Sequence, residues 1–245
     1  MNKLLNTLFA LVVASVTSLA LAQQPPATAP AGAPGANSPG ATPAAGPASP
    51  KSLEAKVAMC VGCHGIVGYK SSFPEVYRVP KIAGQSAKYI AAALNAYKTG
   101  DRKHPTMRGI AESLSDQDVT DIAAYYEKLG AEDRKPIAEK PSREPSAQVA
   151  GLLQKAACAS CHGANFSKPI DPSYPKIGGQ YADYVFVALK AYKTENNPAV
   201  GRNNGVMGAI AKQFSNAELK ALSNYVGSLE GEMATVPESR WHKSH

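Results

Sequence analysis

Apolar positions recur with a helical period through most of the chain after residue 50. Five of them fall at i, i+1, i+4, i+5 and i+8, and five more repeat that spacing 95 residues later: Tyr89, Ile90, Ala93, Leu94 and Tyr97, then Tyr184, Val185, Ala188, Leu189 and Tyr192. This spacing places the side chains on one face of a helix. No run of strand length alternates between apolar and polar residues, so the pattern predicts an all-α fold.

Two further helices are marked by their first residues. Ser115 is followed three residues later by Asp118, and Ser215 by Glu218, each just before an apolar helical face. This pattern is typical of a capping box at a helix N-terminus. A shorter helix is expected to lead into each cysteine pair, beginning near Ser52 and near Ser146.

The chain also repeats itself once. Pro80–Gln85 recurs as Pro175–Gln180, and Leu94–Thr99 recurs as Leu189–Thr194. A period near 97 residues is too long for a solenoid unit, so it indicates two homologous lobes in tandem. The predicted boundaries are a first lobe at 51–130, a Pro- and charge-rich linker at 131–145, a second lobe at 146–233 and a C-terminal tail at 234–245.

The N-terminal part of the chain has a different character. Residues 1–22 combine Lys3, an apolar stretch and Ala20-Leu21-Ala22, which is typical of a cleaved export signal; the alternative is a retained membrane anchor. Residues 23–50 are rich in Pro and Ala and carry no charge, so they are expected to be an extended or disordered linker. Together these segments predict a periplasmic protein, with peripheral membrane association possible through the linker.

Composition and charge narrow the function further. Lys and Arg outnumber Asp and Glu by 26 to 19, which gives a net charge of +7. The excess is spread over both lobes rather than gathered in one stripe, which argues against nucleic acid as a partner. Four cysteines are too few for a disulfide scaffold in 245 residues.

All four cysteines belong to two Cys-x-x-Cys-His sequences, which is the attachment pattern of a c-type haem. The residues are Cys60, Cys63 and His64, and then Cys158, Cys161 and His162. Two thiols three residues apart can reach the vinyl groups on one edge of a porphyrin, and the adjacent histidine becomes the proximal iron ligand. The pattern therefore predicts two covalently bound haem c groups.

Other interpretations of the cysteines fit less well. A zinc ribbon needs its two pairs closer together, and a thioredoxin-like pair needs a βαβ setting. Two local disulfides would leave the two histidines unexplained.

The sixth iron ligand is predicted from the repeat. Met107 lies 43 residues after His64, and Met207 lies 45 residues after His162. A thioether opposite imidazole raises the reduction potential and fills the site, which favours electron transfer. His104 is a rival in the first lobe, whereas Met59 and Met233 are less suitably placed.

Residues around the ligands are assigned from the same repeat. Pro80 and Pro175 are candidates to accept a hydrogen bond from the proximal histidines through their carbonyls. Arg102 and Arg202, each five residues before a predicted Met ligand, are candidates to pair with haem propionates. Lys103 is expected to raise the potential of the first haem only.

Taken together, these motifs resemble the cytochrome c4 family of dihaem class I c-type cytochromes. The resemblance covers about residues 52–230 and rests on the ordered, duplicated motifs given above. It implies two cytochrome c folds related by a pseudo-twofold axis, both haems with His and Met ligands, and the Pro80 and Pro175 carbonyl contacts. The long segment 23–50 and the extra residues 196–200 depart from the family pattern.

The resemblance also implies a role. The family carries electrons in the periplasm from quinol–cytochrome c reductase to a terminal oxidase, which predicts an electron-transfer protein without catalytic residues. Two alternatives are a dihaem subunit that accepts electrons from a dedicated periplasmic dehydrogenase and, less favoured, a dihaem peroxidase. The peroxidase would need one haem with an open coordination position.

Overall fold

The computed structural model describes residues 52–237. The export signal predicted at 1–22, the linker predicted at 23–50 and residues 238–245 of the predicted tail lie outside the described residues. Between residues 52 and 237, no helix has both the length and the apolar character needed to cross a membrane.

The first lobe consists of four helices and three short strands, of which the first two pair with each other. Its elements are α1 Leu53–His64, β1 Lys70–Ser71, β2 Tyr77–Arg78, α2 Ala87–Thr99, β3 Arg102–Lys103, α3 Pro105–Glu112 and α4 Asp116–Lys128. α2 packs on α4, and the face predicted from Ile90, Leu94 and Tyr97 is buried between them. The helix at α1 begins after Ser52, whose side chain accepts a hydrogen bond from the Ala55 N–H at 3.3 Å.

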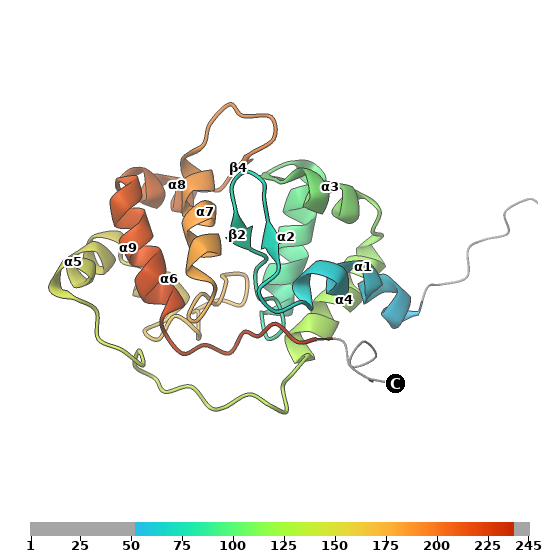
Figure 1. Cartoon of the computed structure of the whole chain (residues 1–245), viewed down its shortest axis with the longest axis horizontal. Helices are drawn as coiled ribbons and strands as arrows, with labels where there is room; N and C mark the ends of the chain where they lie inside the picture. The colour runs from blue at the N-terminus through green and yellow to red at the C-terminus, as the bar shows by residue number, and fades with distance from the viewer. Residues whose placement is uncertain (1–51, 238–245) are drawn as a thin grey trace, which may run out of the picture. The chain divides into compact units, whose positions relative to one another are not determined.

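The second lobe repeats this arrangement. Its elements are α5 Ala147–Ala156, α6 Ala159–His162, α7 Ala182–Lys193, β4 Gly201–Arg202, α8 Gly205–Lys212 and α9 Asn216–Gly227. α7 packs on α9 as α2 packs on α4, and Figure 1 shows α5–α9 grouped apart from α1–α4. The predicted fold of two helical lobes in tandem is confirmed, with short strands as the only departure in the described part of the chain.

The two lobes differ where the chain enters the cysteine motif. In the first lobe α1 continues through Cys60 and Cys63 to His64. In the second lobe Ala157 adopts a left-handed conformation, with φ of 47°, and separates α5 from the single turn of α6. The sequence predicted the leading helices but not this difference between them.

The two lobes pair with each other through β3 and β4. These strands are antiparallel, and Arg102 lies opposite Arg202 in the register. Equivalent residues of two repeats face each other in this way when a twofold axis relates them. The predicted pseudo-twofold relation is therefore visible in the backbone.

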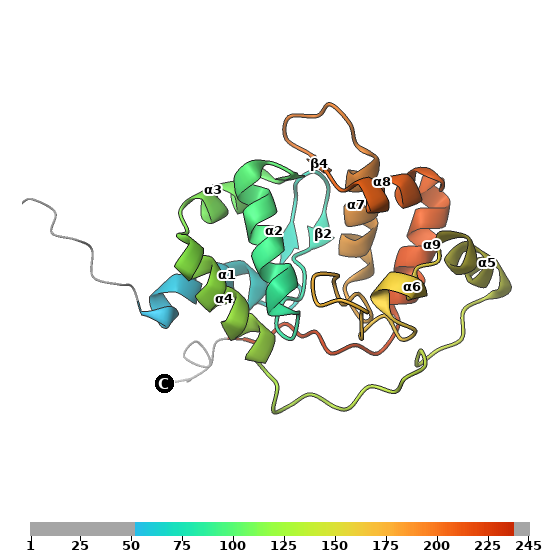
Figure 2. The ribbon, with the colours of Figure 1, turned by 180° about the vertical axis from the view of Figure 1, so that it is seen from behind.

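Residues after α9 return to the first lobe. The Ala234 N–H donates to the Ala83 carbonyl at 3.0 Å, and Val236 packs against the first lobe's core. Figure 2 shows this segment crossing from α9 towards α4, while residues 131–145 connect the lobes along another path. Residues 234–237, which the sequence assigns to a C-terminal tail, therefore pack against the first lobe, although they follow the second lobe in the chain.

The capping boxes predicted at Ser115 and Ser215 are both present. We expect Ser115→Ala and Ser215→Ala each to lower the free energy of unfolding by about 1 kcal/mol, because each leaves one helix N–H, that of Asp118 or Glu218, without its side-chain acceptor. Guanidinium denaturation of the haem-loaded protein measures this. Thr120→Ala, on the exposed face of α4, is the control, with an expected change within about 0.5 kcal/mol.

Candidate functional site

The histidine of each Cys-x-x-Cys-His sequence is held by the carbonyl predicted for it. The Nδ1 of His64 lies 2.8 Å from the Pro80 carbonyl oxygen, and the Nδ1 of His162 lies 2.9 Å from that of Pro175. A carbonyl can only accept, so Nδ1 carries the proton in both rings. The neutral tautomer then leaves a lone pair on Nε2, which is the form that binds a metal.

Burial keeps these imidazoles neutral. Burial lowers the pKa of His64 and of His162. The hydrogen bonds to Pro80 and Pro175 raise these pKa values, but burial has the larger effect. Both rings are therefore uncharged near neutral pH and available as ligands.

The four thiols are half-buried. All four lie within the described residues, and none is in a disulfide. Burial raises the pKa of the Cys60 thiol to about 11 and also raises the pKa of Cys158. A reactive redox cysteine has a lowered thiol pKa, and the raised pKa values of Cys60 and Cys158 run against the thioredoxin-like interpretation.

The predicted Met ligands lie on two short helices that the sequence analysis did not anticipate. Met107 lies in the first turn of α3, and its N–H donates to Nδ1 of His104 at 3.3 Å. Met207 occupies the same place in α8, where its N–H donates to Oδ1 of Asn204 at 2.9 Å. His104, the rival ligand, is therefore the N-cap of α3 and the counterpart of Asn204.

The other two methionines considered have different surroundings. Met59 also borders the cavity that Met107 and Met207 line, but it is 40% exposed on α1, directly before Cys60. Met233 is 5% exposed, and its sulfur accepts hydrogen bonds from Gln85 and Gln180.

The cysteine motifs and both methionines line one cavity of about 810 Å³ that extends through both lobes. Its walls are mostly the apolar helix faces, and the lining residues correspond between the repeats: Leu94, Tyr97, Ile122 and Tyr126 in one lobe, and Leu189, Tyr192, Leu222 and Val226 in the other. All twelve residues singled out as haem-binding candidates line this cavity, and Arg102 and Arg202 do so where the lobes meet.

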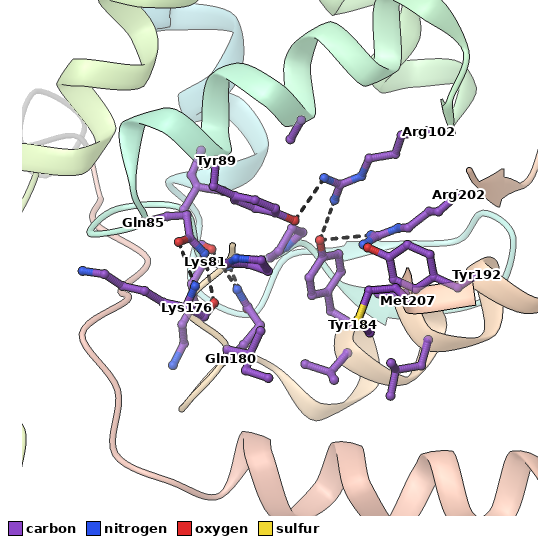
Figure 3. Close-up of a pocket in the computed structure, with 18 of the residues that line it drawn as sticks. Lys81, Gln85, Tyr89, Arg102, Lys176, Gln180, Tyr184, Tyr192, Arg202 and Met207 are labelled. Atoms are coloured by element: carbon purple, nitrogen blue, oxygen red, sulfur yellow. Dashed lines mark hydrogen bonds between the residues drawn. The ribbon is translucent and has the colours of Figure 1, made fainter. Parts of the chain in front are cut away.

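Arg102 and Arg202 converge on one phenol (Figure 3). The Tyr184 hydroxyl accepts hydrogen bonds from Arg102 at 2.6 Å and from Arg202 at 3.1 Å. The Tyr89 hydroxyl accepts a further one from Arg102 at 3.4 Å. Neither guanidinium forms an ion pair with an Asp or Glu of the described chain, and the buried Nε of Arg102 has no hydrogen-bond partner. Two cations without a carboxylate form a site that suits an anionic group.

The same cluster perturbs Tyr184. Burial alone raises the pKa of its phenol, but the guanidiniums of Arg102 and Arg202 outweigh burial and lower that pKa to about 8. The periodicity places Tyr184 on the apolar helix face and does not predict this role. Its polar hydroxyl, at the position equivalent to Tyr89, was the available signal.

The glycine before Gln in each repeated motif is required by a close approach. Gly84 and Gly179 have φ of 85° and 72°. A Cβ on Gly84 would lie 2.5 Å from the Glu232 carbonyl oxygen, and one on Gly179 would lie 3.0 Å from the Leu229 carbonyl oxygen. Glycine at both positions lets residues 229–232 pass against the two loops.

Comparison with known proteins gives consistent matches. Residues 54–130 and 146–230 each match the family Cytochrome c. Cytochrome c4 of Pseudomonas aeruginosa is 32% identical over 180 residues, which cover 72% of this chain and 86% of that protein. A thiosulfate dehydrogenase electron acceptor of Thiomonas intermedia is 28% identical over 195 residues, covering 75% and 84%. The crystal structure of reduced cytochrome c4 from Pseudomonas stutzeri superposes with a TM-score of 0.54 at 31% identity, covering 73% of this chain and 97% of that one.

Proposed function

The chain belongs to the cytochrome c4 family of dihaem class I c-type cytochromes, and from that premise we propose that it carries electrons from quinol–cytochrome c reductase to a terminal oxidase in the periplasm. Its cofactors are two haem c groups, one at each Cys-x-x-Cys-His sequence, and its cytochrome c4 homologues are electron-transfer proteins.

The described residues fit two haem groups. A porphyrin is an apolar plate with two carboxylates on one edge, and the cavity offers apolar walls with two guanidiniums that lack a carboxylate partner. The neutral imidazoles supply free Nε2 lone pairs. Each of these features matches one chemical part of the cofactor.

In this proposal each residue has one task. The four cysteines would form the thioether bonds, and the residues that would hold the two irons are His64 with Met107 and His162 with Met207. Pro80 and Pro175 fix the orientation of the imidazoles through the hydrogen bonds already described. Arg102 and Arg202 would neutralise the propionates. The haem supplies a one-electron reduction and oxidation.

The observation that carries the proposal is the equivalence of the two sites. Both lobes pair a carbonyl-bonded histidine with a methionine on a short helix, and both line the same cavity. Two filled iron sites favour electron transfer over peroxide or oxygen chemistry. This supports a carrier rather than a dihaem peroxidase.

A second candidate is favoured by one of the relatives. The Thiomonas intermedia protein is a thiosulfate dehydrogenase electron acceptor, and its match covers nearly the same share of this chain as that of cytochrome c4 from Pseudomonas aeruginosa. This chain would then take electrons from a dedicated periplasmic dehydrogenase. The two roles share the same haem sites and differ in the electron donor.

Rapid mixing of the oxidised holoprotein with each donor separates these roles. We expect quinol–cytochrome c reductase with a reduced quinol to reduce both haems many times faster than thiosulfate dehydrogenase with thiosulfate, as followed by haem absorbance. A terminal oxidase should then reoxidise the protein. Rapid reduction by the dehydrogenase alone would instead assign the second role.

The proposed location follows from the N-terminal residues. Export through residues 1–22 would deliver the chain to the compartment in which haem c is attached, and residues 23–50 would act as a spacer that permits loose association with the membrane.

A further inference from the structure

Each lobe sends one buried glutamine into the other lobe (Figure 3). Oε1 of Gln180 accepts a hydrogen bond from the Lys81 N–H at 3.0 Å, and its Nε2 donates to the Lys81 carbonyl at 2.9 Å. Oε1 of Gln85 accepts from the Lys176 N–H at 3.0 Å, and its Nε2 donates to the Lys176 carbonyl at 3.0 Å. The two contacts are equivalent under the pseudo-twofold relation.

Both glutamine side chains are buried, and their amide oxygens and nitrogens all make hydrogen bonds. Gln85 and Gln180 are 4% and 5% exposed. Each Oε1 also accepts from the backbone N–H of the residue that follows it, at 3.0 Å. The Nε2 atoms of Gln85 and Gln180 lie 3.3 and 3.7 Å from the Met233 sulfur, which joins the two amides.

Each glutamine binds the same peptide group that accepts a hydrogen bond from a histidine. The Pro80 carbonyl and the Lys81 N–H belong to one peptide group, which accepts from His64 on its oxygen and donates to Gln180 from its nitrogen. The next repeat places the Pro175 carbonyl and the Lys176 N–H between His162 and Gln85 in the same way.

Hydrogen bonds in such a chain strengthen one another. A peptide that donates through its N–H has a more negative carbonyl oxygen, and the gain is about 10–30% per bond. A stronger acceptor draws the Nδ1 proton of the histidine and makes the imidazole a more basic ligand. A more basic ligand stabilises ferric over ferrous iron and lowers the reduction potential.

We propose that Gln180 and Gln85 are positioning residues that act across the lobes, Gln180 on the His64 haem and Gln85 on the His162 haem, by polarising the Pro–Lys peptide that holds each histidine. Each lobe thereby sets part of the potential of its partner's iron. The inference rests on the proposed ligand role of the two histidines.

Two single substitutions test it in the full-length dihaem protein. Gln180→Met keeps the length of the side chain but removes the acceptor for the Lys81 N–H. In the reduced holoprotein, the NMR signal of the His64 Nδ1 proton should move upfield, that of His162 should stay, and the lobe-one potential should rise. Gln85→Met should move the His162 signal upfield and raise the lobe-two potential, while the His64 signal should stay. Because both histidines are observed in each protein, either variant alone suffices if the other fails to fold.

Met233→Leu is the matched control. It removes the sulfur that the two amides share and leaves both glutamine–peptide pairs in place, so both histidine signals should stay. The proposal is overturned if each glutamine substitution shifts the histidine of its own lobe, if both signals shift equally, or if neither shifts in a folded variant. It is equally overturned if Met233→Leu shifts them as strongly.

The proposed function fails in a different way. If reduced wild-type protein shows no histidine Nδ1 signals typical of haem ligands, the ligand assignment is wrong. If those signals are present and follow no glutamine substitution, only the action across the lobes is wrong.

Discussion

Replacing Cys60 and Cys63 by serine is expected to leave a protein with one covalent haem instead of two. Serine cannot form the thioether bonds, and His64 alone does not retain the cofactor through purification. Mass spectrometry of the purified chain should therefore show the mass of one haem, which resists extraction by acid acetone. The lobe-one haem accounts for the whole loss.

The same substitution should also destabilise the first lobe. A lobe of about 80 residues buries only a thin core by itself. Leu94, Tyr97 and Ile122 line the cavity, so without haem these side chains lose their largest apolar partner. We expect a loss of helical circular dichroism and of thermal stability, with the second lobe retaining its haem spectrum.

Cys158→Ser with Cys161→Ser is the control, and it should remove the other haem while the first lobe keeps its own. If the doubly substituted protein of either kind still carries two haems, or if wild-type protein carries none, the haem assignment of the cysteines is wrong. A wild-type mass that shows only two disulfides would also contradict it.

The features predicted from sequence are those that local pattern determines. A capping box is complete within four residues, and both predicted boxes are present at Ser115 and Ser215. The buried face of α2 follows from the period of its apolar residues, because only one face of a helix can meet the core. The Cys-x-x-Cys-His motifs identify the cofactor because the chemistry needs those atoms at that spacing.

The features missed are contacts between residues nearly 100 positions apart. The repeated Gln85 and Gln180 marked a motif, but sequence alone does not show that each amide binds a peptide in the other lobe. The same limit applies to Tyr184, whose hydroxyl accepts hydrogen bonds from both Arg102 and Arg202. Such pairs depend on how the two repeats associate, and no local pattern encodes that.

Lys103 illustrates the consequence for function. From sequence it was expected to act on the first haem only, because it lies four residues before Met107. In the structure its Nζ donates to the Asn197 carbonyl at 2.7 Å, within the extra residues of the second lobe. β3 and β4 also place Lys103 opposite Gly201. A charge at this junction faces both lobes, so the expectation of a purely one-sided effect does not follow from the geometry.

The short helices α3 and α8 escaped prediction for a different reason. Each has only eight residues, too few for a periodic face to stand out, and α8 contains two glycines. His104 and Asn204 cap them, and only the structure shows that both use the same hydrogen bond to the methionine N–H. This equivalence changes how the methionine ligands should be tested.

Met107→Ala is expected to open the first iron site, provided that His104 cannot replace the lost ligand. His104 lines the same cavity, so the substitution is best made together with His104→Asn, which copies the cap present at Asn204. Loss of the thioether should lower the potential of that haem by a fraction of the ~0.8 V range that axial ligands span. The reduced protein should then bind one carbon monoxide per chain, whereas His104→Asn alone should bind close to none.

Met207→Ala gives the matched result in the second lobe, where Asn204 already caps α8 and no second substitution is needed. Each variant should bind one carbon monoxide, and the two changes combined should bind two, because the iron sites lie in separate lobes. Met233→Leu should bind none, since its sulfur contacts Gln85 and Gln180 instead. Binding of carbon monoxide by the unsubstituted protein, or unchanged potentials after loss of Met107 and Met207, would show that other atoms complete the iron coordination.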